Sequence, residues 1–61
     1  MTAREAADRL QKGEEVHVHF STKKEKDDFD YNVLQKLLDL TSCDMRASSR
    51  ALVRLKSTPA P

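Results

Sequence analysis

The residues of this 61-residue chain best suited to metal binding are two histidines and a single cysteine. His17 and His19 are two positions apart, so in a strand their imidazoles share a face and could approach one ion. Zinc sites in proteins use at least three protein ligands, and the only further candidate, Cys43, lies at a spacing that matches no finger or ribbon pattern. We therefore predict no metal site and no cofactor.

Nucleophilic catalysis is also poorly supported by the sequence. Cys43 could act as a thiol nucleophile beside a histidine, but no third group is placed to orient that pair. Gly13 is the only glycine, so no glycine-rich loop can cradle an oxyanion or a phosphate. The run Thr41-Ser42-Cys43-Asp44 is typical of a turn or a helix cap. We predict no catalytic residue, no small-molecule substrate and no enzymatic activity.

The strongest functional signal is an asymmetry of charge along the chain. Residues 1–44 carry 7 basic and 10 acidic side chains, whereas residues 45–61 carry four basic side chains and no acidic one. Three of the four, Arg46, Arg50 and Arg54, recur at every fourth position and share a face in either a helix or a strand. Arginine binds carboxylates and phosphates with paired hydrogen bonds. This face is therefore a predicted contact for phosphates or an acidic partner. The alternative is a solvated face that pairs with the chain's own excess of aspartate and glutamate.

Length and composition exclude several classes of protein. The net charge is only +1 and 38% of the residues are hydrophobic, which argues against a disordered tail and against a strongly cationic nucleic-acid coat. A single cysteine excludes a disulfide scaffold. No apolar run approaches the length of a membrane span, about 20 residues. We expect a cytoplasmic protein with no membrane contact and one domain over residues 1–56, followed by a flexible tail at 57–61.

The first elements that must position these side chains are a helix and a strand. Residues 3–12 are predicted to be helical, because Thr2 and Glu5 form a capping box and the only glycine, Gly13, lies where the helix should end. Residues 14–20 alternate between apolar and polar types, which is typical of a half-buried strand. Its apolar side holds Val16, Val18 and Phe20.

A second helix is predicted after a charged segment at residues 21–28. Its start is either a capping box at Thr22 and Glu25 or the acidic cluster at residues 27–30. One apolar stripe consists of Phe29, Val33, Leu37 and Leu40. An adjacent stripe consists of Leu34 and Leu38, with Tyr31 at its edge. The apolar arc is too wide for one small sheet to cover, so we expect Tyr31, Leu34 and Leu38 to contact a partner.

Residues 44–56 fit both a strand and a helix. Intrinsic propensity favours a helix. The first strand, however, needs a hydrogen-bonding partner, and this is the only other segment with a period of two. We therefore predict a strand over residues 49–56 and keep a helical C-terminal segment as the alternative. The predicted fold is a small α+β domain of order α-β-α-β, with two helices on a short sheet that dimerisation completes. Parallel and antiparallel strand pairing remain open.

These features favour a small non-enzymatic regulator or inhibitor that docks onto a protein, with homodimerisation expected. Its size is typical of accessory regulators such as those of phages and mobile elements. The predicted contact residues are Arg46, Arg50, Arg54, Tyr31, Leu34 and Leu38. The alternative is a dimeric nucleic-acid-binding transcriptional regulator that uses the basic C-terminal segment.

Overall fold

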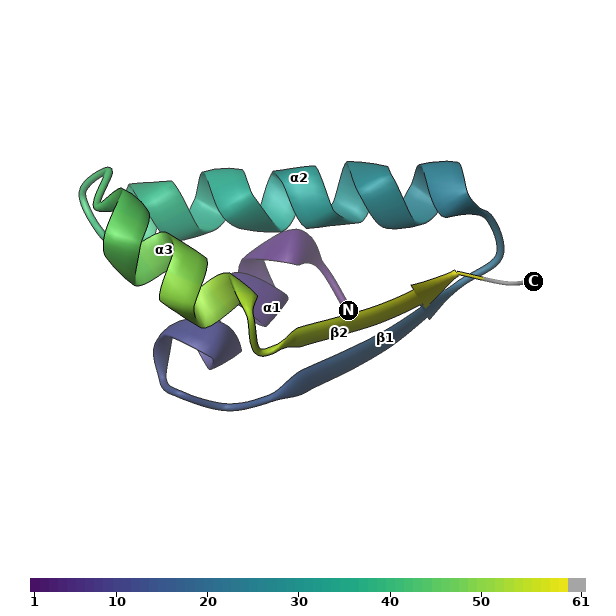
Figure 1. Cartoon of the computed structure of the whole chain (residues 1–61), viewed down its shortest axis with the longest axis horizontal. Coiled ribbons are helices and arrows are strands. Elements are labelled where there is room, and N and C mark those ends of the chain that lie inside the picture. Colours follow the sequence, from purple (N-terminus) through teal and green to yellow (C-terminus); the bar gives the residue numbers. More distant parts are fainter. Residues whose placement is uncertain (60–61) are drawn as a thin grey trace.

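The computed structural model describes residues 1–59 as an α+β domain with three helices and a two-stranded sheet. The elements follow the order α1 (Ala3–Gln11), β1 (Val16–Phe20), α2 (Lys23–Leu40), α3 (Met45–Leu52) and β2 (Leu55–Pro59). In Figure 1, α2 runs along the length of the molecule above the two strands, and α1 and α3 lie toward the end where α2 finishes. The predicted α+β class is confirmed, but the expected pair of helices is wrong because α3 is a third.

Helix α1 begins and ends where the sequence indicates. Thr2 is the N-cap, and its Oγ1 accepts a hydrogen bond from the amide of Glu5 at 3.2 Å. Gly13 has φ +90°, the left-handed conformation that follows a helix end and favours glycine. The buried face of α1 consists of Ala6, Ala7 and Leu10, and the two alanines allow neighbouring backbones to approach closely.

The two strands pair in parallel. Val16 is opposite Leu55, and the register continues to Phe20 opposite Pro59. Parallel pairing requires a crossover connection, which α2 and α3 supply together. Alternation along β1 is as predicted, because Val16 is buried, Val18 and Phe20 are half-buried, and the histidines between them are exposed.

Helix α2 starts at the capping box rather than at the acidic cluster. Thr22 is its N-cap, and Thr22 Oγ1 accepts a hydrogen bond from the amide of Glu25 at 3.2 Å. Val33 and Leu37 are completely buried. Phe29 packs against Phe20 of β1 with ring centroids 5.1 Å apart, which fixes α2 over the sheet.

The predicted strand over residues 49–56 is wrong, because residues 45–52 form α3. Asp44 caps this helix, since its Oδ1 accepts hydrogen bonds from the amides of Arg46 (3.0 Å) and Ala47 (3.1 Å). Small residues explain why this segment is a helix. Ser48 and Ala51 are buried, and their short side chains let α3 pack closely on the other two helices. The helical alternative is therefore confirmed for residues 45–52, whereas Leu55 and Lys56 belong to a strand, as predicted.

The partner of β1 lies further along the chain than predicted. Residues 57–59, expected in a flexible tail, are part of β2, while residues 60–61 lie outside the described part of the chain. Pro59 is compatible with the strand because it is the last residue of β2. The amide of Val16 donates to the carbonyl of Arg54 at 3.2 Å and opens the ladder.

Two polar contacts tie α2 to the C-terminal elements. Thr41 Oγ1, at the end of α2, donates to the carbonyl of Leu37 (2.8 Å) and lies 3.0 Å from Oγ of the buried Ser48. Nearer the start of α2, Asp30 accepts hydrogen bonds from Lys26 Nζ and from Ser57 Oγ, both at 2.9 Å. The first contact fixes α3 against α2, and the second fixes β2.

We expect Leu10→Ala and Ser48→Ala to have very different effects on stability. Leu10 is completely buried, and such truncations cost about 2–5 kcal/mol, comparable to the roughly 3–5 kcal/mol available to a domain of this size. Ser48→Ala should cost only about 1 kcal/mol, because Thr41 keeps its bond to Leu37. Urea unfolding followed by circular dichroism measures both. A cooperative transition of normal midpoint for Leu10→Ala would contradict this account of the core.

The Lys26–Asp30–Ser57 network makes stability depend on pH in the alkaline range. The hydrogen bond from Lys26 to Asp30 is the main cause that raises the pKa of Lys26 above 10.5, and the negative charges of Asp30 and Asp27 add to it against partial desolvation. Because the folded-state pKa is the higher one, the stabilisation is complete below 10.5 and is lost as the pH rises through the folded value.

We therefore expect Asp30→Asn to lower the urea midpoint at neutral pH and to make less difference well above pH 10.5. Asp28→Asn removes the same charge from an exposed position of α2 and is the matched control. An equal loss at both pH values would assign the effect to the Ser57 contact alone.

Candidate functional site

The three predicted arginines lie on α3 and on the turn that follows it. Arg46 and Arg50 are one helical turn apart on α3, and Arg54 is in the turn before β2. All three are exposed, because the opposite side of α3 carries the buried Ser48 and Ala51. A strand over residues 49–56 would have placed Arg50 and Arg54 on the sheet face of His17 and His19, but Arg50 lies in α3 and Arg54 in the turn before β2.

The turn between α2 and α3 sets the direction of α3. Ser42 and Cys43 both have a positive φ, 55° and 65°, which is uncommon for residues other than glycine. The amide of Cys43 donates to the carbonyl of Leu38 at 2.7 Å and closes the end of α2. Asp44 then starts α3. Tight closure at this turn, together with the Thr41–Ser48 contact, holds the arginine side of α3 toward solvent.

No arginine in residues 1–59 forms an ion pair within those residues. The ion pairs there join Lys12 to Asp8 and Lys26 to Asp30, and His17 Nε2 lies 2.6 Å from Glu15 Oε1. The predicted bland role for the arginines, neutralising the chain's own carboxylates, is therefore not seen among the described residues. Their guanidinium donors face solvent and can bind a ligand.

Arg50 and Arg54 border a shallow hollow of about 190 Å³ where α3 meets the end of α1. The other lining residues are Leu10, Gln11, Thr41, Ala47 and Ala51. Arg46 is not among them. The structure thus brings two of the three arginines to one hollow and leaves the third near the start of α3.

The predicted apolar stripe is only partly available. Tyr31 is 63% exposed, whereas Leu34 and Leu38 are half-buried. Neither leucine belongs to the core cluster or to the partly buried apolar residues packed on it. Leu34 lies one turn after Asp30, which contacts β2, and Leu38 lies one turn before the Thr41–Ser48 contact. Helical periodicity therefore places both leucines on the side of α2 next to β2 and α3.

Sequence reasoning missed the exposure of three apolar residues. Leu40, assigned to the buried stripe, is 42% exposed because it is the last residue of α2. Met45 and Val53, at the two ends of α3, are 59% and 71% exposed. A helical interpretation of residues 45–52 would have placed Val53 beside Arg46 and Arg50, opposite the small residues.

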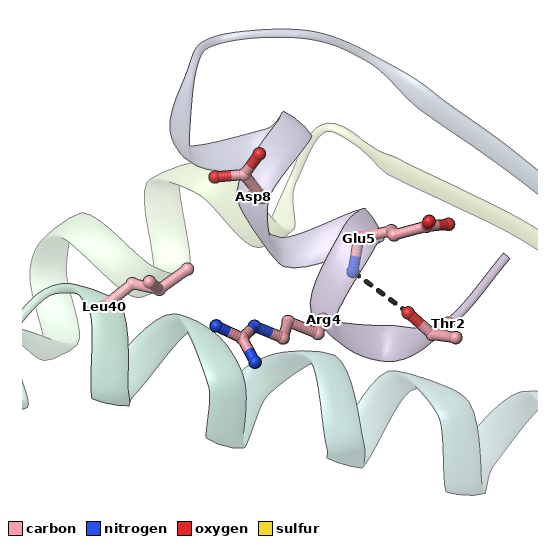
Figure 2. A pocket seen from close by; sticks show the side chains of 5 residues that line it. All are labelled: Thr2, Arg4, Glu5, Asp8 and Leu40. Atoms are coloured by element: carbon pink, nitrogen blue, oxygen red, sulfur yellow. Dashed lines mark hydrogen bonds between the residues drawn. The ribbon is translucent and has the colours of Figure 1, made fainter.

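A second hollow, of about 370 Å³, lies between α1 and the end of α2. Figure 2 shows its five lining side chains, Thr2, Arg4, Glu5, Asp8 and Leu40. Arg4 extends over α2, whereas the side chain of Glu5 extends in the opposite direction (Figure 2). The lining combines one cation, Arg4, with two carboxylates, and the hydroxyl of Thr2 accepts a hydrogen bond from the amide of Glu5 rather than facing a general base.

The described residues contain no group of three or more histidine, cysteine, aspartate or glutamate side chains placed to hold a metal ion. Within the same part of the chain, no helix is both long enough and apolar enough to cross a membrane. Comparison with protein-family models, with curated proteins and with solved structures gives no match.

We expect substitution of the arginines to leave the fold intact. Arg46→Ser and Arg50→Ser should each change the free energy of unfolding by less than about 1 kcal/mol, because both side chains are exposed and form no ion pair within residues 1–59. Arg50 should show the larger change, since it lies in the last turn of α3 and a cation there is favourable. Thermal melting measures both, and a larger loss would assign the arginines a structural role.

Proposed function

We propose that this protein is a non-enzymatic binding module, a regulator or inhibitor that docks an acidic protein partner against α3 and the adjacent side of α2. The observation that carries the proposal is the set of three exposed arginines, Arg46, Arg50 and Arg54, without ion-pair partners among residues 1–59. The chain has ten acidic side chains, yet none of those in residues 1–59 pairs with an arginine.

Exposed apolar groups on α3, on its turn and on α2 favour a protein over a nucleic acid as partner. Met45 and Val53 are exposed at the two ends of α3, and Tyr31 is exposed on α2. Protein interfaces combine such apolar and aromatic anchors with arginine. A nucleic-acid site instead needs phosphate contacts spread over a basic surface. The net charge is only +1, and outside residues 45–61 the acidic side chains outnumber the basic ones.

The two kinds of residue have different roles in this docking. Arg50 and Arg54 border a hollow with an apolar floor that includes Leu10 and Ala51. A carboxylate of the partner in this hollow would accept paired hydrogen bonds in a partly desolvated setting, where they are stronger. Arg46 is further from the hollow and should mainly accelerate association by long-range attraction. The half-buried leucines of α2 then add apolar contact.

Charge reversal tests the proposal. We expect Arg50→Glu with Arg54→Glu to lose proteins that the purified wild-type chain retains from its native host. Arg4→Glu with Lys36→Glu makes the same change in net charge on exposed residues elsewhere and should retain them. Quantitative affinity capture, followed by titration of the retained protein, measures the difference, and circular dichroism confirms that both variants fold.

Titration with a mixed-sequence DNA duplex covers the alternative. The protein-binding proposal predicts no complex at low salt. Binding that weakens with a log–log salt slope of about −0.9 per phosphate contact, and that Arg50→Glu abolishes, would replace the proposal with a nucleic-acid-binding function. Equal retention of partners by the two charge-reversal variants would also overturn it.

A further inference from the structure

The outer edge of β1 carries backbone groups that the sheet does not use. The amide of Val16 donates to Arg54 across the ladder, and successive residues of a strand direct their amides and carbonyls to opposite sides. The amides and carbonyls of His17 and His19 therefore point away from β2. Among residues 1–59 the sheet consists of β1 and β2 alone, and β1 runs along the lower margin of the molecule with no helix drawn below it (Figure 1). This edge can accept another strand.

The outer edge of β2 is less suited to pairing. By the same alternation, Leu55, Ser57 and Pro59 direct their backbone groups outward, and Pro59 has no amide hydrogen to donate. Ser57 is also held by its hydroxyl to Asp30 of α2. Of the two edges, β1 offers the complete set of donors and acceptors.

We propose that the protein is a homodimer in which β1 pairs with β1 of a second copy, antiparallel, about a twofold axis at Val18. In this register His17 lies opposite the partner's His19, and these two residues exchange both of their free backbone hydrogen bonds. The twofold axis repeats the exchange at His19. Two small sheets then become one four-stranded sheet with β1 strands at its centre, which is a more stable unit than a two-stranded ribbon.

The sequence of β1, Val-His-Val-His-Phe, is close to self-complementary about its centre. Antiparallel pairing at Val18 puts Val18 against the partner's Val18 and Val16 against the partner's Phe20, all on the side that faces the helices. Val18 and Phe20 are half-buried in the single chain, so pairing covers apolar surface that is otherwise exposed to solvent. The exposed histidines stay together on the opposite side.

Charge complementarity at the ends of β1 also favours a second copy as the occupant. Glu14 and Glu15 precede β1, and Lys23 and Lys24 open α2 three residues after β1 ends. Antiparallel pairing brings the acidic start of one β1 to the basic end of the other. Lys23 and Lys24 form no ion pair within residues 1–59, so the same attraction operates at both ends of the interface.

A proline substitution on the free edge tests this dimer. We expect the wild-type chain to have twice its 6.9 kDa mass in light scattering. His19→Pro removes an amide that the single chain does not use, so it should give a folded monomer with at least a tenfold weaker self-association. His19→Thr keeps the amide and a strand-forming side chain and should remain dimeric. A monomeric wild-type chain, or a folded His19→Pro variant that is still dimeric, would overturn the proposal.

A disulfide tests the register even if His19→Pro fails to fold. At the twofold axis the two Val18 Cα atoms would be about 4.5 Å apart, because they form a non-hydrogen-bonded pair, and this distance suits a disulfide. In a Cys43→Ser background, Val18→Cys should form a covalent dimer under mild oxidation, whereas Thr58→Cys on β2 should not. Equal cross-linking of both variants, or none at Val18→Cys, would overturn the proposed register.

The dimer and the docking site are separable. Arg50→Glu with Arg54→Glu changes only α3 and its turn, so this variant should keep the dimeric mass while it loses the acidic partner. The dimer proposal therefore survives or fails independently of the proposed function.

Discussion

The parallel pairing of β1 with β2 is the constraint on which the rest of this structure depends. Two strands that run in the same direction cannot be joined by a short hairpin, so the chain must return along the whole sheet before it can pair. Helix α2 makes that return, and α3 uses the remaining length before β2 begins. The exposed side of α3 is therefore fixed by the geometry of the crossover, since α1 and α2 occupy its other side.

Small residues make this crossover possible in so short a chain. Ala6 and Ala7 of α1, with Ser48 and Ala51 of α3, are buried where the helices meet. Large buried side chains are few, and Leu10, Val33 and Leu37 are the main ones that are completely covered. Each contributes about 1.5–3 kcal/mol, so the stability of the fold rests on a handful of contacts. Hydrogen bonds such as that from Ser57 to Asp30 therefore account for a measurable part of the free energy that holds β2 against α2.

The elements that were predicted correctly are those whose sequence features lie within the element itself. Helix α1 was predicted because its Thr2 cap, its helical period and Gly13 agree, and β1 was predicted because its residues alternate with a period of two. The capping box at Thr22, one of two predicted starts for α2, is the one that the structure shows. Residues 49–52 were misassigned to a strand because the alternation of small and basic residues there fits both periods. What decides between them is tertiary, namely the close approach of Ser48 and Ala51 to the other helices. The strand at Ser57–Pro59 was missed because a proline near the end of the chain resembled a tail. Of the six predicted contact residues, the exposure of Arg46, Arg50 and Tyr31 follows from helical phase, and that of Arg54 from its place in a turn. The partial burial of Leu34 and Leu38 depends instead on where α3 and β2 pack.

The proposed dimer and the proposed docking surface place consistent demands on one small fold. Strand pairing uses the edge of β1, and docking uses α3 and the neighbouring side of α2, so neither interaction occupies the surface of the other.

A twofold axis at Val18 reverses the direction of the second copy, which puts the two arginine-bearing helices toward opposite ends of the four-stranded sheet. Such a dimer presents two identical basic surfaces that one small acidic protein cannot occupy together. A partner with two acidic sites at matching separation would bind far more tightly than either site alone, because the second contact is intramolecular. Dimerisation would then select extended or oligomeric acidic partners, a selectivity that three arginines on an eight-residue helix and its turn could not provide in a single copy.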